Sequence, residues 1–95
     1  MKKAFLLVYN HAVTREEVTD WADDCSLVES WRNELPNCIF LVSESNTGQL
    51  SADFDRRFPA DSVRYIVQQF STRSEGMLTA AGWHFLNEKS DEPTS

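Results

Sequence analysis

The sequence predicts a single α+β domain of the ferredoxin-like type, in which two strand–helix–strand units share one antiparallel sheet. Two observations predict this fold. Strand-like and helix-like segments alternate in the order β-α-β-β-α-β, and the two segments expected at the centre of the sheet are continuous apolar runs. Central strands are covered on both sides, so they can be apolar throughout. A chain of 95 residues suits one core of this kind.

The first unit covers residues 4–33. Residues 4–9 form an apolar run of strand length. Thr14 followed by Glu17 predicts an N-terminal capping box, and the next apolar residues repeat at helical spacing. That stripe consists of Val18, Trp21, Ala22 and Cys25. Residues 27–33 alternate only weakly between apolar and polar, which predicts an edge strand.

The second unit covers residues 38–70. Residues 38–42 form another continuous apolar strand. Leu50, Phe54 and Phe58 predict a helix that Pro59 ends. Residues 63–70 are β-branched and aromatic, which predicts a fourth strand. We further expect a short helix over residues 77–87 capped by Thr79, and a disordered acidic tail over residues 88–95 beyond a domain of residues 1–87.

Right-handed crossovers place the two apolar strands in the middle of the sheet and both helices on one face. The other face then has no helix, although apolar side chains line both faces of the central strands. Such a surface needs a cover. We expect a homodimer partner, or the C-terminal segment with Trp83 and Phe85, to pack against it.

Charge and composition indicate which kinds of partner and which cell compartment to expect. Nine basic and fifteen acidic residues give a net charge of −6, which disfavours nucleic acid because Lys and Arg supply the affinity for phosphates. No apolar run is long enough to span a membrane. Without a secretion signal, we expect a cytoplasmic protein whose Cys25 and Cys38 are reduced. The His and Cys spacings match no zinc motif, and we expect no metal and no cofactor.

Three polar residues after the central strands are candidates for catalysis. Asn10 and His11 follow the first strand, and Glu44 follows the third. We expect these two strands to run parallel and side by side, so that the two loops are neighbours. His11 with Glu44 could then act as an acid–base pair. The alternative is that Asn10 and His11 only cap their loop. We expect no enzymatic activity, since no catalytic motif is present.

Other candidates concern binding. Arg73 lies among Ser, Thr and Gly residues and could hold a phosphate or carboxylate, although this composition is also typical of a solvated loop. Trp31, on the expected edge strand, is either a cover for the sheet or an anchor for a partner. Together with Trp83 and Phe85 it is our candidate for partner contact.

The run from Phe5 to Asn10, the hairpin from Trp31 to Val42 and the segment Gly82-Trp83-His84-Phe85 resemble small ferredoxin-like proteins of the CRISPR-associated endoribonuclease-like group and related bacterial proteins. The resemblance implies a ferredoxin-like fold and a dimer. Nuclease members of that group place a metal-binding aspartate where this chain has Asn10. Because Asn is an uncharged and poorer ligand for Mg²⁺, this difference argues against metal-dependent cleavage.

Three hypotheses for function follow. The first is a non-catalytic homodimeric interaction or regulatory module. The second is a nucleic-acid-directed module or weak endoribonuclease of the CRISPR-associated type, with Asn10, His11 and Glu44 near the reaction and Arg73 on phosphate. The third is a regulatory domain that binds a small molecule in a dimer cleft.

Overall fold

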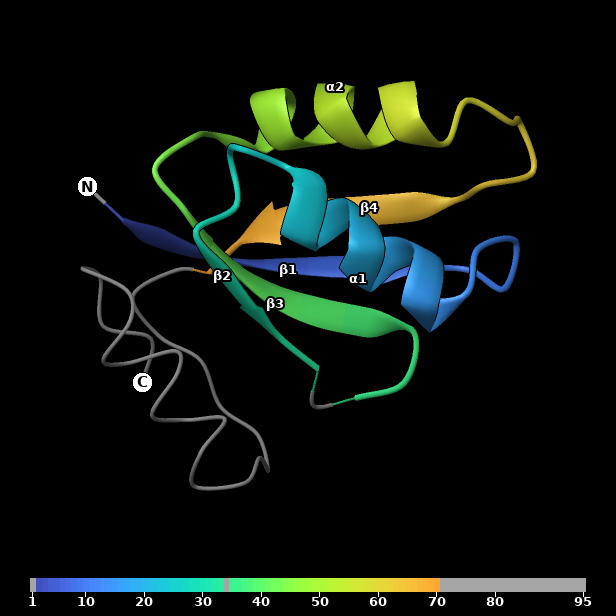
Figure 1. Cartoon of the computed structure of the whole chain (residues 1–95), viewed down its shortest axis with the longest axis horizontal. Helices are drawn as coiled ribbons and strands as arrows, with labels where there is room; N and C mark the ends of the chain where they lie inside the picture. The colour runs from blue at the N-terminus through green and yellow to red at the C-terminus, as the bar shows by residue number, and fades with distance from the viewer. Residues whose placement is uncertain (1, 34, 71–95) are drawn as a thin grey trace.

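Four antiparallel strands and two helices make up the part of the chain that this computed structural model describes, residues 2–33 and 35–70. The elements are, in order, β1 (Lys3–Tyr9), α1 (Arg15–Asp24), β2 (Ser30–Arg32), β3 (Cys38–Ser43), α2 (Thr47–Arg57) and β4 (Tyr65–Gln69). The sheet order is β2-β3-β1-β4, and both helices cover one face (Figure 1). The ferredoxin-like prediction is therefore confirmed. The expected helix over residues 77–87, the tail and the domain limit at residue 87 lie outside the described residues.

The two apolar runs form the centre of the sheet, as predicted. β1 and β3 pair antiparallel from Lys3 opposite Ser43 to Val8 opposite Cys38, and every residue of β3 is buried. Alternate β1 residues point to opposite faces. Phe5, Leu7 and Tyr9 therefore join the core beneath the helices, while Ala4 and Leu6 belong to a second cluster on the helix-free face.

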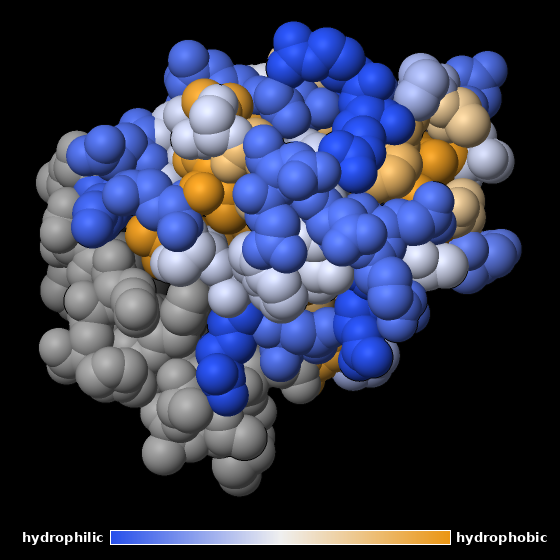
Figure 2. Space-filling view, viewed as in Figure 1, coloured by the Kyte–Doolittle hydropathy of each residue, from blue (hydrophilic) through white to orange (hydrophobic). Residues whose placement is uncertain are grey.

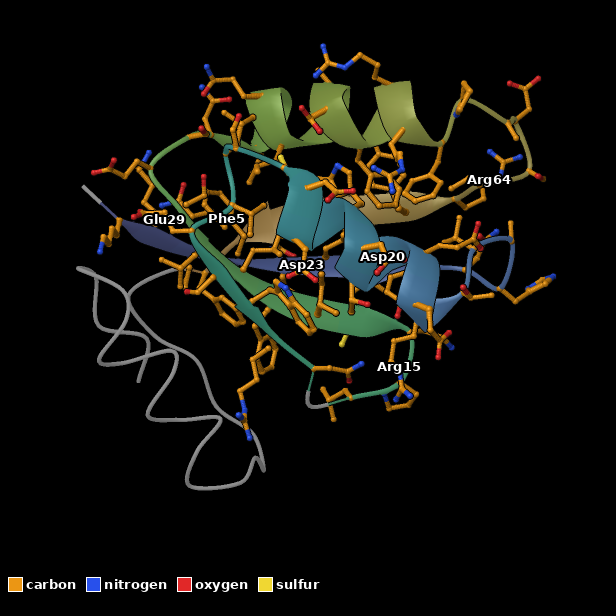
Figure 3. The ribbon with its side chains drawn as sticks, viewed as in Figure 1. Phe5, Arg15, Asp20, Asp23, Glu29 and Arg64 are labelled. Carbon is orange, nitrogen blue, oxygen red and sulfur yellow. The ribbon has the colours of Figure 1, made fainter. Side chains whose placement is uncertain are left out.

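The helix-side core joins both helices to the sheet. The Trp21 ring of α1 meets the Phe54 ring of α2 edge-on, with centroids 5.1 Å apart, and Phe54 also contacts Phe58 and Tyr65. Val18 and Ala22 of α1 and Leu50 of α2 are also buried, whereas the solvent-facing sides of the helices are polar. Asp20 and Asp23 are exposed acidic residues of α1 (Figure 3), and hydrophilic side chains dominate the face seen in Figure 2. No described helix is long and apolar enough to cross a membrane.

Both helices begin with a capping box. At α1, Thr14 Oγ1 accepts from the Glu17 amide at 3.1 Å, and Glu17 Oε1 accepts from the Thr14 amide at 2.9 Å. The predicted cap is therefore confirmed. At α2, Asn46 and Gln49 make the same reciprocal pair, a cap that we did not predict. This pair starts α2 at Thr47, three residues before Leu50, the first apolar residue of the predicted stripe.

The two edge strands are shorter than predicted. β2 has three residues rather than the expected 27–33, because the amide of Val28 donates to Cys25 O in a turn before the strand begins. β4 begins at Tyr65 rather than residue 63, because the Val63 amide donates to Ala60 O in the preceding turn. Local turns at the strand ends therefore shorten both edges of the sheet.

Replacing the α1 cap tests this account of helix initiation. Thr14→Ala leaves the Glu17 amide without its side-chain acceptor and should lower the free energy of unfolding by about 1 kcal/mol. Thr19→Ala is the matched control, because the Thr19 hydroxyl only donates to Glu16 O within the helix. Urea unfolding measures both variants. Equal losses in the two would contradict a capping role for Thr14.

Candidate functional site

The predicted acid–base pair is separated by the length of the sheet. β1 and β3 are neighbours, but they run antiparallel rather than parallel: Ser43 lies opposite Lys3, at the start of β1. Glu44 therefore leaves the sheet at one end, whereas Asn10 and His11 follow Tyr9 at the other. The seven residues of β1 span about 20 Å at roughly 3.3 Å per residue. The prediction that these loops are neighbours is wrong, and His11 and Glu44 cannot exchange a proton directly.

Asn10 instead joins two segments of the chain at its end of the sheet, the loop after β1 and the turn before β4. Its Nδ2 donates to Ser62 O at 3.0 Å, and its Oδ1 accepts from the amides of Ala12 and Arg64, each at 3.2 Å. The Asn10 amide also donates to Arg64 O at 2.9 Å. Both halves of the side-chain amide are thus used, which agrees with the capping alternative for Asn10.

Of the residues proposed for partner contact, the structure describes Trp31. Trp31 lies opposite Leu41, so its side chain is on the helix face, where it packs against the core. Its Nε1 donates to Asp23 Oδ1 of α1 at 2.7 Å. Trp31 thus covers the β2 edge beneath α1, and its role in partner contact stays a prediction. Arg73, Trp83 and Phe85 lie outside the described residues.

The helix-free face has a buried end and an exposed end. Phe40 and Val42 of β3 and Ala4 of β1 are buried there, with Phe70 edge-on against Phe40 at 5.8 Å. At the other end, Val8 is 37% exposed and Ile66 is 58% exposed. These two residues are direct cross-strand neighbours on β1 and β4. Exposed apolar area on this face therefore gathers beside β4.

β4 is an edge strand, and no other strand within residues 2–33 and 35–70 pairs with its outer side. In its ladder with β1, the Asn10 amide donates to Arg64 O and the Phe70 amide donates to Ala4 O. Because inward and outward backbone groups alternate along an antiparallel strand, the N–H and C=O of Tyr65 and Val67 point away from β1. These groups can pair with another strand.

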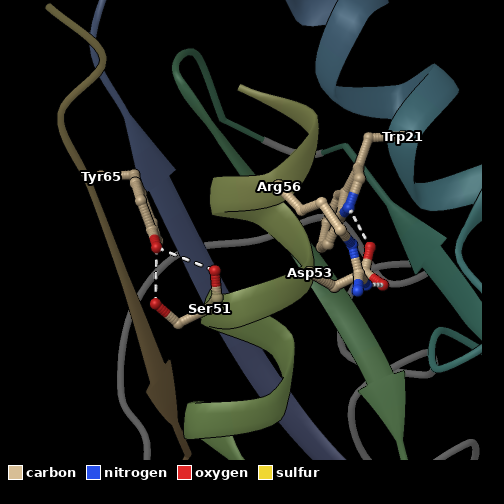
Figure 4. Close-up of polar contacts among 5 residues, drawn as sticks. All are labelled: Trp21, Ser51, Asp53, Arg56 and Tyr65. Carbon is tan, nitrogen blue, oxygen red and sulfur yellow. Dashed lines mark hydrogen bonds and ion pairs between the residues drawn. The ribbon is translucent and has the colours of Figure 1, made fainter. Parts of the chain in front are cut away.

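A groove follows this open edge on the helix side. It has a volume of about 460 Å³ and is lined by Thr47, Gly48, Ser51, Tyr65, Ile66 and Val67. Tyr65 lines it beside α2. The Tyr65 Oη bonds Ser51 O at 3.1 Å and Ser51 Oγ (Figure 4), and it lies 2.7 Å from Asp55 Oδ1. Burial and the nearby Asp55 carboxylate raise the pKa of Tyr65. The phenol is therefore neutral at pH 7 and holds α2 against β4.

A second polar cluster lies between the ends of the two helices. Asp53 Oδ1 accepts from Trp21 Nε1 at 2.9 Å, and Asp53 Oδ2 accepts from Arg56 at 2.6 Å (Figure 4). Arg57 reaches Asp24 of α1 at 3.3 Å. A cavity of about 300 Å³ lies beside these residues, and the ion pairs Asp53–Arg56 and Asp24–Arg57 line it. Each arginine there is already matched by a carboxylate, so the cavity offers no surplus charge to a ligand.

The two cysteines are poorly suited to covalent chemistry. Cys25 and Cys38 are free and buried, and burial raises the pKa of both thiols. A raised pKa leaves less of the reactive thiolate at pH 7. Within residues 2–33 and 35–70, no group of three or more His, Cys, Asp or Glu side chains is placed to hold a metal ion.

One buried hydroxyl among the described residues, that of Tyr9, lacks a hydrogen-bond partner. It belongs to the helix-side core at the end of β1, and burial raises the pKa of this phenol. The packing of the core gives no reason for tyrosine rather than phenylalanine at this position.

Asn10→Asp tests whether Asn10 is a structural clamp. A carboxylate cannot donate to Ser62 O, so the variant should lose about 1–2 kcal/mol of unfolding free energy at pH 7, and recover part of it when acid protonates the new carboxyl. His11→Ala is the control, since His11 is exposed beside the clamp. Denaturant unfolding at neutral and acidic pH measures both. If Asn10→Asp is as stable as the parent at pH 7, Asn10 is not a clamp.

The lowered pKa of the Asp53 carboxyl predicts that the protein loses stability in acid. Burial alone would raise the pKa of its carboxyl, but hydrogen bonds from Trp21, Cys25 and Arg56 outweigh burial and lower that pKa. A lowered folded-state pKa stabilises the native state above about pH 4, and this contribution is lost as pH falls through the folded-state value.

Asp53→Asn should therefore flatten the dependence of unfolding free energy on pH below about pH 4. Asp20→Asn, which changes an exposed carboxylate of α1, is the control and should leave the slope close to that of the parent. Urea titrations at a series of acidic pH values give both slopes. The same slope in the Asp53 variant and the parent would show that Asp53 is not the responsible group.

Comparison with known proteins finds no match for this chain among family models, curated proteins or solved structures. The resemblance to the CRISPR-associated group therefore stays a prediction.

Proposed function

We propose that this chain is a non-catalytic homodimeric interaction module that associates through the β4 side of its helix-free face. One observation carries the proposal: Val8 and Ile66, direct neighbours on that face, are 37% and 58% exposed. Single exposed apolar residues are ordinary. An adjacent pair beside an open strand edge is a surface that association would remove from water.

Two further observations support a module without catalysis. The acid–base pair that the sequence suggested is divided between opposite ends of β1 and β3. Asn10 stands where the nucleases that this chain resembles have a metal-binding aspartate. Its side-chain amide is hydrogen-bonded to the backbone of Ser62, Ala12 and Arg64. We place the module in the cytoplasm, where two free, buried cysteines fit a reducing compartment.

The dependence of association on salt concentration should distinguish a homodimer from a nucleic-acid-binding protein. Each copy has a net charge of −6, so two copies repel one another at low ionic strength, and salt should strengthen their association by screening. Nucleic-acid binding has the opposite dependence, since salt weakens it.

The test of the proposal is the mass of the full chain by sedimentation velocity over a wide concentration range, at low and moderate salt. We expect a monomer–dimer equilibrium that shifts toward dimer with salt. Ile66→Glu should weaken it at least tenfold, because it introduces a charge into the apolar contact. Ala52→Glu, which adds the same charge at an exposed position of α2, should cause less change. A chain that stays monomeric under every condition would refute the proposal.

A further inference from the structure

We infer that the second copy pairs strand to strand, with β4 of one copy antiparallel to β4 of the other and a two-fold axis beside Ile66. This inference rests on the proposed homodimer and adds its geometry. The two four-stranded sheets would then join into one continuous sheet, with all the helices on the same side.

The backbone of β4 is ready for such a pairing. The N–H and C=O groups of Tyr65 and Val67 point outward, as the inward bonds of Arg64 and Phe70 to β1 require. A second β4 running in the opposite direction presents the same outward groups. Each copy would therefore donate and accept the same set of hydrogen bonds, which is the condition for a two-fold interface.

The side chains of β4 lack the features that usually protect an edge. The strand Tyr65–Gln69 contains no charged residue and no proline, whereas edge strands commonly carry Lys, Pro or a bulge that prevents pairing. The opposite edge differs: β2 is three residues long and includes Arg32. β4 is therefore the edge of the described sheet that suits another strand.

The exposed apolar residue selects the register. Outward-pointing residues must pair with outward-pointing residues, so Tyr65 can lie opposite Val67 of the second copy. Ile66 then lies opposite Ile66 of the second copy, as a close pair without hydrogen bonds. Val8 flanks Ile66 on each side, so the helix-free face would carry a continuous apolar row of Val8, Ile66, Ile66 and Val8.

No like charges oppose each other in this register. The charged neighbour of the strand, Arg64, would lie opposite Gln68 of the second copy. On the helix side, the groove of about 460 Å³ leaves space beside Val67 for Tyr65 of the second copy, because Gly48 and Ser51 line it with little bulk. In this register the two β4 strands overlap directly only over residues 65–67. The interface is small, so we expect a dimer that dissociates on dilution.

Disulfide trapping tests the register directly. In Ile66→Cys, the two new thiols would lie opposite each other at the two-fold axis, about 4.5–5.5 Å apart at Cβ, close to disulfide geometry. Mild oxidation of the full chain should give a covalent dimer at least tenfold faster than in Gln68→Cys. Gln68 is on the same face and is also exposed, but its two copies would be four residues apart along the paired strands, about 13 Å.

The parent chain gives the background rate of cross-linking. We expect this rate to be low, because its two cysteines, Cys25 and Cys38, are buried. Val67→Pro is a second test, since it removes an outward N–H and leaves the inward ladder to β1 in place. We expect a folded monomer by circular dichroism and sedimentation. If Val67→Pro does not fold, the comparison of Ile66→Cys with Gln68→Cys is by itself the test of the β4 pairing.

The outcomes distinguish the inference from the proposed function. A dimer in which Ile66→Cys and Gln68→Cys cross-link equally slowly, or in which Gln68→Cys is faster, would overturn the β4 pairing while the homodimer stands. A chain that is monomeric at every concentration would overturn both. The open edge would then be available to a segment of the chain itself or to another protein.

Discussion

The antiparallel ladder between β1 and β3 sets the position of the other described elements. Its register places Phe5, Leu7 and Ile39 beneath the helices and Phe40 and Val42 on the other face. A shift of one residue would exchange these sets, because side chains alternate along a strand. The same ladder sends the loops after β1 and β3 to opposite ends, which separates His11 from Glu44. The apolar core and the absence of the acid–base pair thus have one cause.

Carboxylates of both helices make contacts that cross between elements. Acids near the C-terminal end of a helix oppose its dipole, yet Asp23 accepts from Trp31 of β2, and Asp24 pairs with Arg57 of α2. Asp53 completes the set through Trp21 of α1. These carboxylates therefore connect the two helices to each other and to the β2 edge.

The helix-free face and the β4 edge together are the basis on which we propose self-association. Apolar exposure on that face gathers at Val8 and Ile66, next to the strand with outward backbone groups. Pairing through β4 would satisfy those groups and cover the apolar residues in one step. The net charge of each copy works against this contact at low salt. Such a balance suits a dimer that forms and dissociates with conditions rather than a permanent one.

The amino-acid sequence was enough to predict the order of elements, the two central strands, the Thr14–Glu17 cap and the buried faces of both helices. These features depend on residues within a few positions of one another, through the periods of strand and helix and the chemistry of capping. The tertiary structure was needed to show that Asn10 clamps Ser62 and Arg64 and that Trp31 faces Asp23. It also showed that no strand of the described residues covers the β4 edge beside Ile66. Those contacts join residues far apart in the chain, and strand direction and register, which no local pattern encodes, decide which of them meet.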